Sequence, residues 1–86
     1  MTYHVTWHLN AIRQLNLLVA AAAVPAFVQQ AGQWVDYTLR RTPLDMGESR
    51  TPGFRLWYGD VLGVYYRVDE EARTVRVLAI GPARRR

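Results

Sequence analysis

The sequence predicts an α+β domain in which a two-helix hairpin packs on one face of a small, mainly antiparallel sheet, with the element order β-α-α-β-β-β. Three observations lead to this prediction. The chain has 86 residues, which is enough for a single domain (1–86) with one core. Half of the residues are hydrophobic, which is well above the level typical of disordered chains. Apolar residues recur every three or four positions between residues 9 and 41 and every second position after residue 53.

The first half of the chain predicts one strand followed by two helices. Apolar and polar residues alternate over residues 3–7, as they do in a short strand. A helical stripe of apolar residues covers 9–22 and is broken at Pro25, because proline donates no amide hydrogen and fits best in the first turn of a helix. A second stripe covers 28–41 and ends in two arginines, which are favourable at a helix C-terminus. We expect an antiparallel helix hairpin, and a single helix kinked at Pro25 is the alternative.

The second half predicts three strands after a turn-rich connection at residues 42–53. The strands cover 54–58, 62–68 and 74–80 and are separated by polar or glycine-containing turns. Alternation divides the side chains of each strand into two sets. In the first strand, Phe54, Leu56 and Tyr58 are on one face, and Arg55 and Trp57 are on the other. In the second strand, Leu62, Val64, Tyr66 and Val68 are opposite Gly63, Tyr65 and Arg67. In the third strand, Val75, Val77 and Ala79 are opposite Thr74, Arg76, Leu78 and Ile80.

Two amphipathic helices need an apolar sheet face to cover, and the set that begins with Leu62 is the strongest candidate. The opposite face would then carry a basic surface interleaved with aromatic rings, formed by Arg55, Trp57, Tyr65, Arg67 and Arg76. Guanidinium groups bind phosphates and aromatic rings stack on unpaired bases, so such a surface suits nucleic acid. The alternative is the ordinary solvated face of an antiparallel sheet. We expect the large rings of Trp7 and Trp34 to pack in the core.

The charge distribution indicates an acidic partner. All eleven basic residues are arginines, and seven acidic residues leave a net charge of +4. The charges of residues 1–49 sum to zero, so residues 50–86 carry the whole surplus. A one-sided basic half of this kind suits RNA, DNA or an acidic protein segment.

Composition excludes several other classes of protein. The chain has no cysteine, which rules out disulfides and thiolate metal sites, and its two histidines, His4 and His8, do not share a helix. We therefore expect no metal, no cofactor and no small-molecule substrate. The apolar stretch 17–28 contains Pro25, is shorter than the about 20 residues that span a bilayer, and lacks the basic leader of a signal peptide. We expect a cytoplasmic protein without membrane contact.

Several segments together resemble a known family. They are YHVTW near the N-terminus, TLRRTP at the end of the second helix, GESR at Gly47–Arg50, and GFRLWYGDVLGVYYRVDEEARTVRVLAIGPARRR at Gly53–Arg86. With the element order, they make the chain similar to the RelE/ParE superfamily, the plasmid-stabilisation-like toxins of bacterial type II toxin–antitoxin pairs. The resemblance implies one of two activities and a cognate antitoxin protein as partner. RelE-like members are ribosome-dependent, metal-independent mRNA endonucleases, and ParE-like members bind DNA gyrase without being nucleases.

The resemblance also suggests site residues. Arg55 matches the basic residue of the second strand, Arg84 or Arg85 matches the arginine after the last strand, and Arg50 matches a basic residue of the preceding loop. As catalytic residues we expect Arg55, Tyr65 and Arg84, and as nucleic-acid-binding residues Arg50, Trp57, Arg67, Arg76 and Arg85.

The chain departs from the family pattern at two places. It ends at Arg86 without the tyrosine that follows the last arginine, and Leu62-Gly63 stands where many members have an arginine. Tyr65 or Tyr58 could supply the missing phenol. We expect RelE-like mRNA cleavage, with little activity on RNA without the ribosome. The alternatives are ParE-like inhibition of gyrase, or an inactive member that binds RNA or protein.

Overall fold

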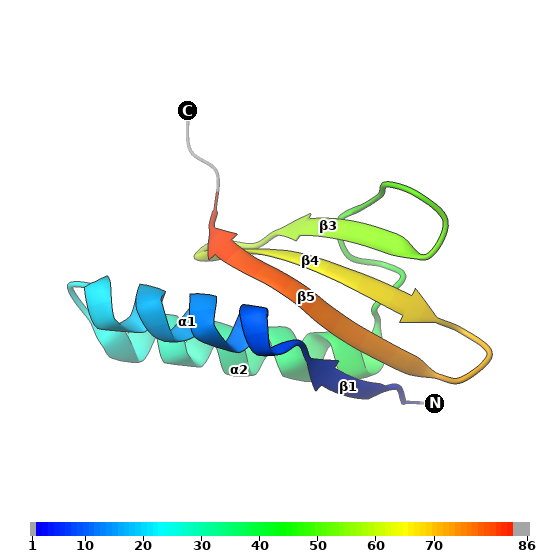
Figure 1. Cartoon of the computed structure of the whole chain (residues 1–86), viewed down its shortest axis with the longest axis horizontal. Helices are drawn as coiled ribbons and strands as arrows, with labels where there is room; N and C mark the ends of the chain where they lie inside the picture. Colours follow the sequence, from blue (N-terminus) through cyan, green and yellow to red (C-terminus); the bar gives the residue numbers. More distant parts are fainter. Residues whose placement is uncertain (1, 84–86) are drawn as a thin grey trace.

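The computed structural model describes residues 2–83 and has the predicted α+β architecture, with one further strand of two residues (Figure 1). The elements are β1 (His4–Trp7), α1 (Leu9–Ala21), α2 (Pro25–Arg41), β2 (Glu48–Ser49), β3 (Phe54–Tyr58), β4 (Leu62–Asp69) and β5 (Thr74–Pro82). The sequence patterns predicted β2 as part of a loop. Both helices lie on the same side of the sheet (Figure 1).

The helix hairpin is confirmed, and the single kinked helix is wrong. His8 caps the start of α1, since its Nδ1 accepts a hydrogen bond from the backbone N–H of Asn10 (3.0 Å). Pro25 is the first residue of α2, where the missing amide hydrogen would have no partner in the helix. The two helices approach closely at Gly32, because a Cβ added there would lie 2.9 Å from a methyl group of Leu15.

The five strands form one mixed sheet in the order β1-β5-β4-β3-β2. Strand β1 pairs with β5 in parallel, and all other neighbours are antiparallel, as expected for a mainly antiparallel sheet. The parallel pair needs a crossover between its strands, and the helix hairpin lies within that connection. This topology puts the long strands β4 and β5 at the centre of the sheet.

The core lies between the helices and the sheet. Strand β4 contributes the predicted set of Leu62, Val64, Tyr66 and Val68, all of which are buried. The other buried hydrophobic residues come from both halves of the chain: Val5, Ala11, Val28, Val35, Leu39, Trp57, Val75, Val77 and Ile80.

The predicted orientation of β3 is wrong. Arg55 pairs with Tyr66 and Trp57 pairs with Val64, and directly paired residues on neighbouring strands project to the same face. Arg55 and Trp57 therefore lie on the helix-facing side, where Trp57 is only 9% exposed. Alternation sorts a strand into two sets without saying which set faces the core, and the pairing with β4 decides it.

The predicted alternation of β5 is wrong at its C-terminal end because of a β-bulge. Tyr65 pairs with Ala79 but Tyr66 pairs with Val77, so Leu78 has no partner and the phase shifts by one residue. Ile80 is therefore buried on the helix side, and Ala79 lies on the opposite face. The side-chain oxygen of Gln14 accepts a hydrogen bond from the backbone N–H of Ile80 (2.7 Å), which ties α1 to the strand beyond the bulge.

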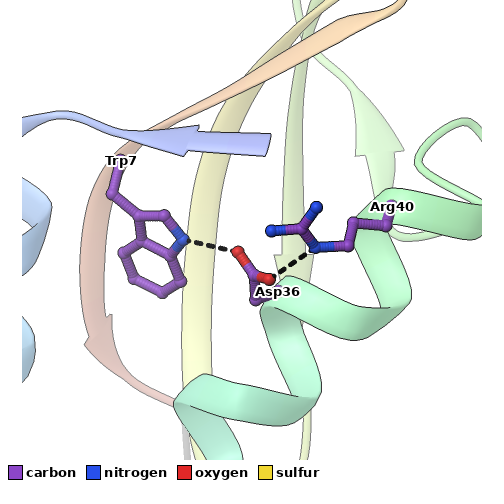
Figure 2. A network of polar contacts seen from close by, with 3 residues as sticks. All are labelled: Trp7, Asp36 and Arg40. Atoms are coloured by element: carbon purple, nitrogen blue, oxygen red, sulfur yellow. Dashed lines mark hydrogen bonds and ion pairs between the residues drawn. The ribbon is translucent and has the colours of Figure 1, made fainter. Parts of the chain in front are cut away.

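A polar contact joins the N-terminal strand to α2 (Figure 2). The indole Nε1 of Trp7 donates to Asp36 Oδ1 (3.0 Å), and the guanidinium Nε of Arg40 donates to Asp36 Oδ2 (2.8 Å). Trp7 packs against the core as expected. The core expectation for Trp34 is wrong, because that side chain is 59% exposed. Neither helix is long and apolar enough to cross a membrane within the residues described.

The position of Val64 leads to a stability prediction. This side chain is 1% exposed, so Val64→Asp places a carboxylate against the helices and should unfold the domain. Circular dichroism and thermal melting measure the effect. The matched control is Val61→Asp, since Val61 is 41% exposed and the variant should fold. A folded Val64→Asp variant would show that the helices do not cover this face.

Candidate functional site

We call the side of the sheet that faces away from the helices the open face. Strand pairing places its side chains in rows across the sheet. One row runs Thr6, Arg76, Arg67 and Phe54; the next runs Ala79, Tyr65 and Leu56; and the last holds Gly81, Gly63 and Tyr58. The face is therefore basic toward one end and apolar and aromatic toward the other.

The basic end of the open face consists of Thr6, Arg67, Thr74 and Arg76. Arg67 and Arg76 are directly paired across β4 and β5, and both are exposed. Together with Asp69, the four residues line a hollow of about 240 Å³. Each arginine is able to offer a planar set of N–H donors to an anion in this hollow.

An aromatic pair connects the basic end to the rest of the open face. The rings of Phe54 and Tyr65 are stacked, with centroids 5.8 Å apart. The guanidinium carbon of Arg67 lies 5.7 Å from the centroid of the Phe54 ring, within the range of a cation–π contact. Of the predicted site residues, the structure thus brings Tyr65, Arg67 and Arg76 onto one face.

The other end of the open face is a shallow apolar hollow. It has a volume of about 240 Å³, and Leu56, Tyr58, Tyr65 and Ala79 contribute to its lining. The Tyr58 ring covers Gly63, so closely that an added Cβ at Gly63 would lie 2.8 Å from a ring carbon. At the position where the family resemblance suggested an arginine, the protein therefore has a glycine shielded by a tyrosine ring.

Arg55 holds the loop after α2 against the sheet. Its Nε donates to the backbone oxygen of Met46 (2.9 Å) and its Nη2 donates to that of Gly47 (3.2 Å). The buried hydroxyl of Tyr66 donates to the backbone oxygens of Pro43 (2.7 Å) and Met46 (3.1 Å). Burial raises the pKa of the Tyr66 phenol, although a hydrogen bond and the positive charge of Arg55 act in the opposite direction.

The remaining predicted site residues lie elsewhere. Trp57 is in the core, on the side opposite the open face. Arg50 is exposed just after β2 and lies 3.8 Å from a carboxylate oxygen of Glu48. Arg84 and Arg85 lie outside the described residues 2–83. The sequence patterns missed Phe54, Thr6 and Thr74 as residues of the basic end and its neighbourhood, because only the register across β1, β5, β4 and β3 brings them together.

A second exposed surface lies along α2. Phe27, Trp34 and Tyr37 project outward, and the rings of Trp34 and Tyr37 are stacked with centroids 5.4 Å apart. Between this side of α2 and the β3–β4 turn lies a hollow of about 600 Å³, to which Trp34, Tyr58 and Val61 contribute. A group of exposed apolar side chains on this scale is typical of a protein-interaction surface.

Comparison with known proteins identifies the fold. No family model and no curated protein matches the chain. Among solved structures, the RelBE2 toxin–antitoxin complex from Mycobacterium tuberculosis matches with a TM-score of 0.77 and 25% identity, over 98% of this chain and 100% of the other. The chromosomal ParDE system of P. aeruginosa matches with a TM-score of 0.70 and 16% identity, over 95% and 97%. The isolated E. coli RelE toxin matches with a TM-score of 0.68 and 15% identity, over 98% and 87%.

These structural neighbours are toxins of type II toxin–antitoxin pairs, and the chain has the α+β fold that they share. The chain therefore has the fold of the RelE/ParE superfamily, as the resemblance predicted. The similarity extends to both the RelE and the ParE branch.

The hydrogen bonds of Arg55 predict a structural role for this residue. Arg55→Ala removes both bonds to the loop and should lower the free energy of unfolding by about 1–3 kcal/mol. Urea denaturation measures the change. The control is Arg76→Ala, which removes the same charge from an exposed position. The free energy of unfolding of this variant should stay within about 0.5 kcal/mol of that of the unaltered protein. Equal stability of the two variants would mean that Arg55 does not hold the loop.

The raised pKa of Tyr66 predicts a loss of stability at high pH. The folded protein disfavours the phenolate more than the unfolded chain does, so the contribution of Tyr66 to stability is complete below the pKa of a free tyrosine, about 10, and declines above it. The free energy of unfolding should therefore fall less between about pH 8 and pH 10.5 in Tyr66→Phe than in the unaltered protein. Identical pH profiles for the two proteins would contradict this assignment.

Proposed function

We propose that this chain is the toxin of a type II toxin–antitoxin pair, and that it acts by binding a macromolecular target rather than by cutting RNA. The fold and the structural neighbours support the first part. The observation that supports the second is the orientation of β3. Arg55, which the family resemblance associates with catalysis, is on the helix side and bonds to loop carbonyls, while Leu56 and Tyr58 occupy the open face.

RNA cleavage through the 2′-hydroxyl needs a group that accepts its proton and positive charge beside the phosphate. Arginine stays protonated, so it supplies charge but is not a base. The side chains paired across the strands or stacked with Tyr65 on the open face are Phe54, Leu56 and Ala79, which offer contact area instead of proton transfer. Binding, by contrast, needs only exposed and complementary side chains, which favours a ParE-like action on DNA gyrase.

RelE-like cleavage of mRNA on the ribosome is the second candidate. It is supported by the 25% identity to the RelBE2 complex over nearly the whole chain, and by Tyr65, a phenol that lies on the open face beside Phe54. In this case the ribosome would have to supply a proton-transfer group. The cognate antitoxin is part of both proposals, since several neighbours are toxin–antitoxin complexes. Both targets would place the protein in the cytoplasm.

Two assays with the purified full chain distinguish these activities. The first is primer extension on a reporter mRNA in a reconstituted translation reaction, and the second is supercoiling by DNA gyrase. We expect intact message and inhibited gyrase. New cuts in the message that depend on the ribosome would contradict binding as the mechanism, and the absence of both effects, together with no growth arrest on expression, would contradict a toxin function.

Variants of the open face test the same proposal in cells. Tyr65→Phe keeps the ring that a binding surface needs but removes the phenol, so growth arrest should persist. Leu56→Glu places a charge in the apolar hollow and should abolish growth arrest while the circular dichroism spectrum stays unchanged. Loss of toxicity in Tyr65→Phe, with Leu56→Glu still toxic, would favour the endonuclease.

A further inference from the structure

We propose that two copies of this chain associate through α2 as an antiparallel, twofold-symmetric dimer. The surface that we assign to this contact consists of Phe27, Trp34, Tyr37 and Arg41 on α2, together with the hollow of about 600 Å³ between α2 and the β3–β4 turn. We call it the α2 surface. The inference goes beyond the proposed function, because it concerns the protein by itself, without a target or an antitoxin.

The first argument is the exposed aromatic area of the α2 surface. Phe27, Trp34 and Tyr37 are each between 51% and 64% exposed. Since an aromatic side chain can bury about 150–250 Å², these three rings leave roughly 300–400 Å² in contact with water. This is close to half of the about 800 Å² that each partner buries in a stable complex. Tyr58 and Val61, which are exposed on the other side of the hollow, add to the area. The α2 surface therefore has the size of a reversible dimer contact.

The second argument is the spacing of side chains along α2. Phe27, Trp34 and Arg41 follow one another at intervals of seven residues, which is about two helical turns, so they lie on one stripe of the helix. Trp34 is at the middle of this stripe, about 10 Å along the helix axis from either end. A twofold axis at Trp34 brings the two indole rings together. It also places Phe27 of each copy level with Arg41 of the other, as a self-complementary surface requires.

The third argument is the charge complementarity of the two ends of the α2 surface. At one end, Asp60 and Phe27 line the hollow. At the other end, the guanidinium carbon of Arg41 lies 5.4 Å from the centroid of the Tyr37 ring. Neither Asp60 nor Arg41 takes part in an ion pair among residues 2–83. In the antiparallel arrangement, Arg41 of each copy lies at the hollow of the other, where Asp60 offers the opposite charge and Phe27 offers a ring face.

The position of the two charges favours a second copy over an unrelated partner. A foreign helix needs only the apolar stripe in order to pack on α2. An acid near one end and a base at the other complement each other only when the same surface is presented in the opposite direction. Each contact between Asp60 and Arg41 then occurs twice in the dimer.

Sedimentation velocity of the purified full chain over about 1–100 μM tests the association, because this range brackets the affinity expected of a small interface. We expect a reversible shift from the mass of one chain to the mass of two. Trp34→Gln should raise the dissociation constant of the dimer by about tenfold or more. The matched control is Leu17→Gln, which removes an exposed apolar side chain from α1 and should leave the dissociation constant unchanged.

Circular dichroism checks that both variants fold. A chain that stays monomeric up to about 100 μM would overturn the proposal and leave the α2 surface to a different partner. A dimer that persists in Trp34→Gln, or that is weakened equally by Leu17→Gln, would overturn it as well, because the contact would then lie elsewhere.

An exchange of charges tests the antiparallel arrangement. Arg41→Glu and Asp60→Arg each place like charges opposite one another and should weaken the dimer by about tenfold. The double variant Arg41→Glu/Asp60→Arg restores opposite charges and should recover most of the affinity. The control is Arg13→Glu, which makes the same change of charge at an exposed position on α1 and should not weaken the dimer. Equal weakening by Arg13→Glu and Arg41→Glu, or no recovery in the double variant, would overturn the pairing of Asp60 with Arg41.

Discussion

The hydroxyl group of Tyr66 is buried, so it has to find an acceptor inside the protein. It finds two, the backbone oxygens of Pro43 and Met46, in the loop that follows α2. Arg55, its neighbour across the strands, donates to the same oxygen of Met46 and to that of Gly47. These bonds hold the loop over the helix-facing side of β3 and β4. The side chains left for the open face are then Phe54, Leu56 and Tyr58 by alternation.

The opposite edge of the sheet is held by different contacts. Strand β1 joins β5 in parallel, and Trp7 reaches from β1 to Asp36 on α2, which also binds Arg40 (Figure 2). Both helices cover the same side of the sheet, and residues 2–83 contain no further helix that could cover the other side. The open face is thus available to a ligand over the lengths of β3, β4 and β5.

The open face combines two kinds of chemistry. One end offers apolar and aromatic contact area around Tyr58, and the other offers two guanidinium groups with hydroxyls beside them. The Phe54–Tyr65 stack joins the two ends.

The sequence by itself determined the element order, the helix break at Pro25 and the buried set of β4, because each depends on local periodicity or on the chemistry of one residue. It also pointed to Tyr65, Arg67 and Arg76 as residues of one face. Only the tertiary structure decided that Arg55 and Trp57 face the helices, and that the bulge at Leu78 turns Ile80 inward. Alternation divides the side chains of a strand into two sets but does not say which set faces the helices. That choice is made by the pairing with the neighbouring strands and by the hydrogen bonds that buried polar groups need.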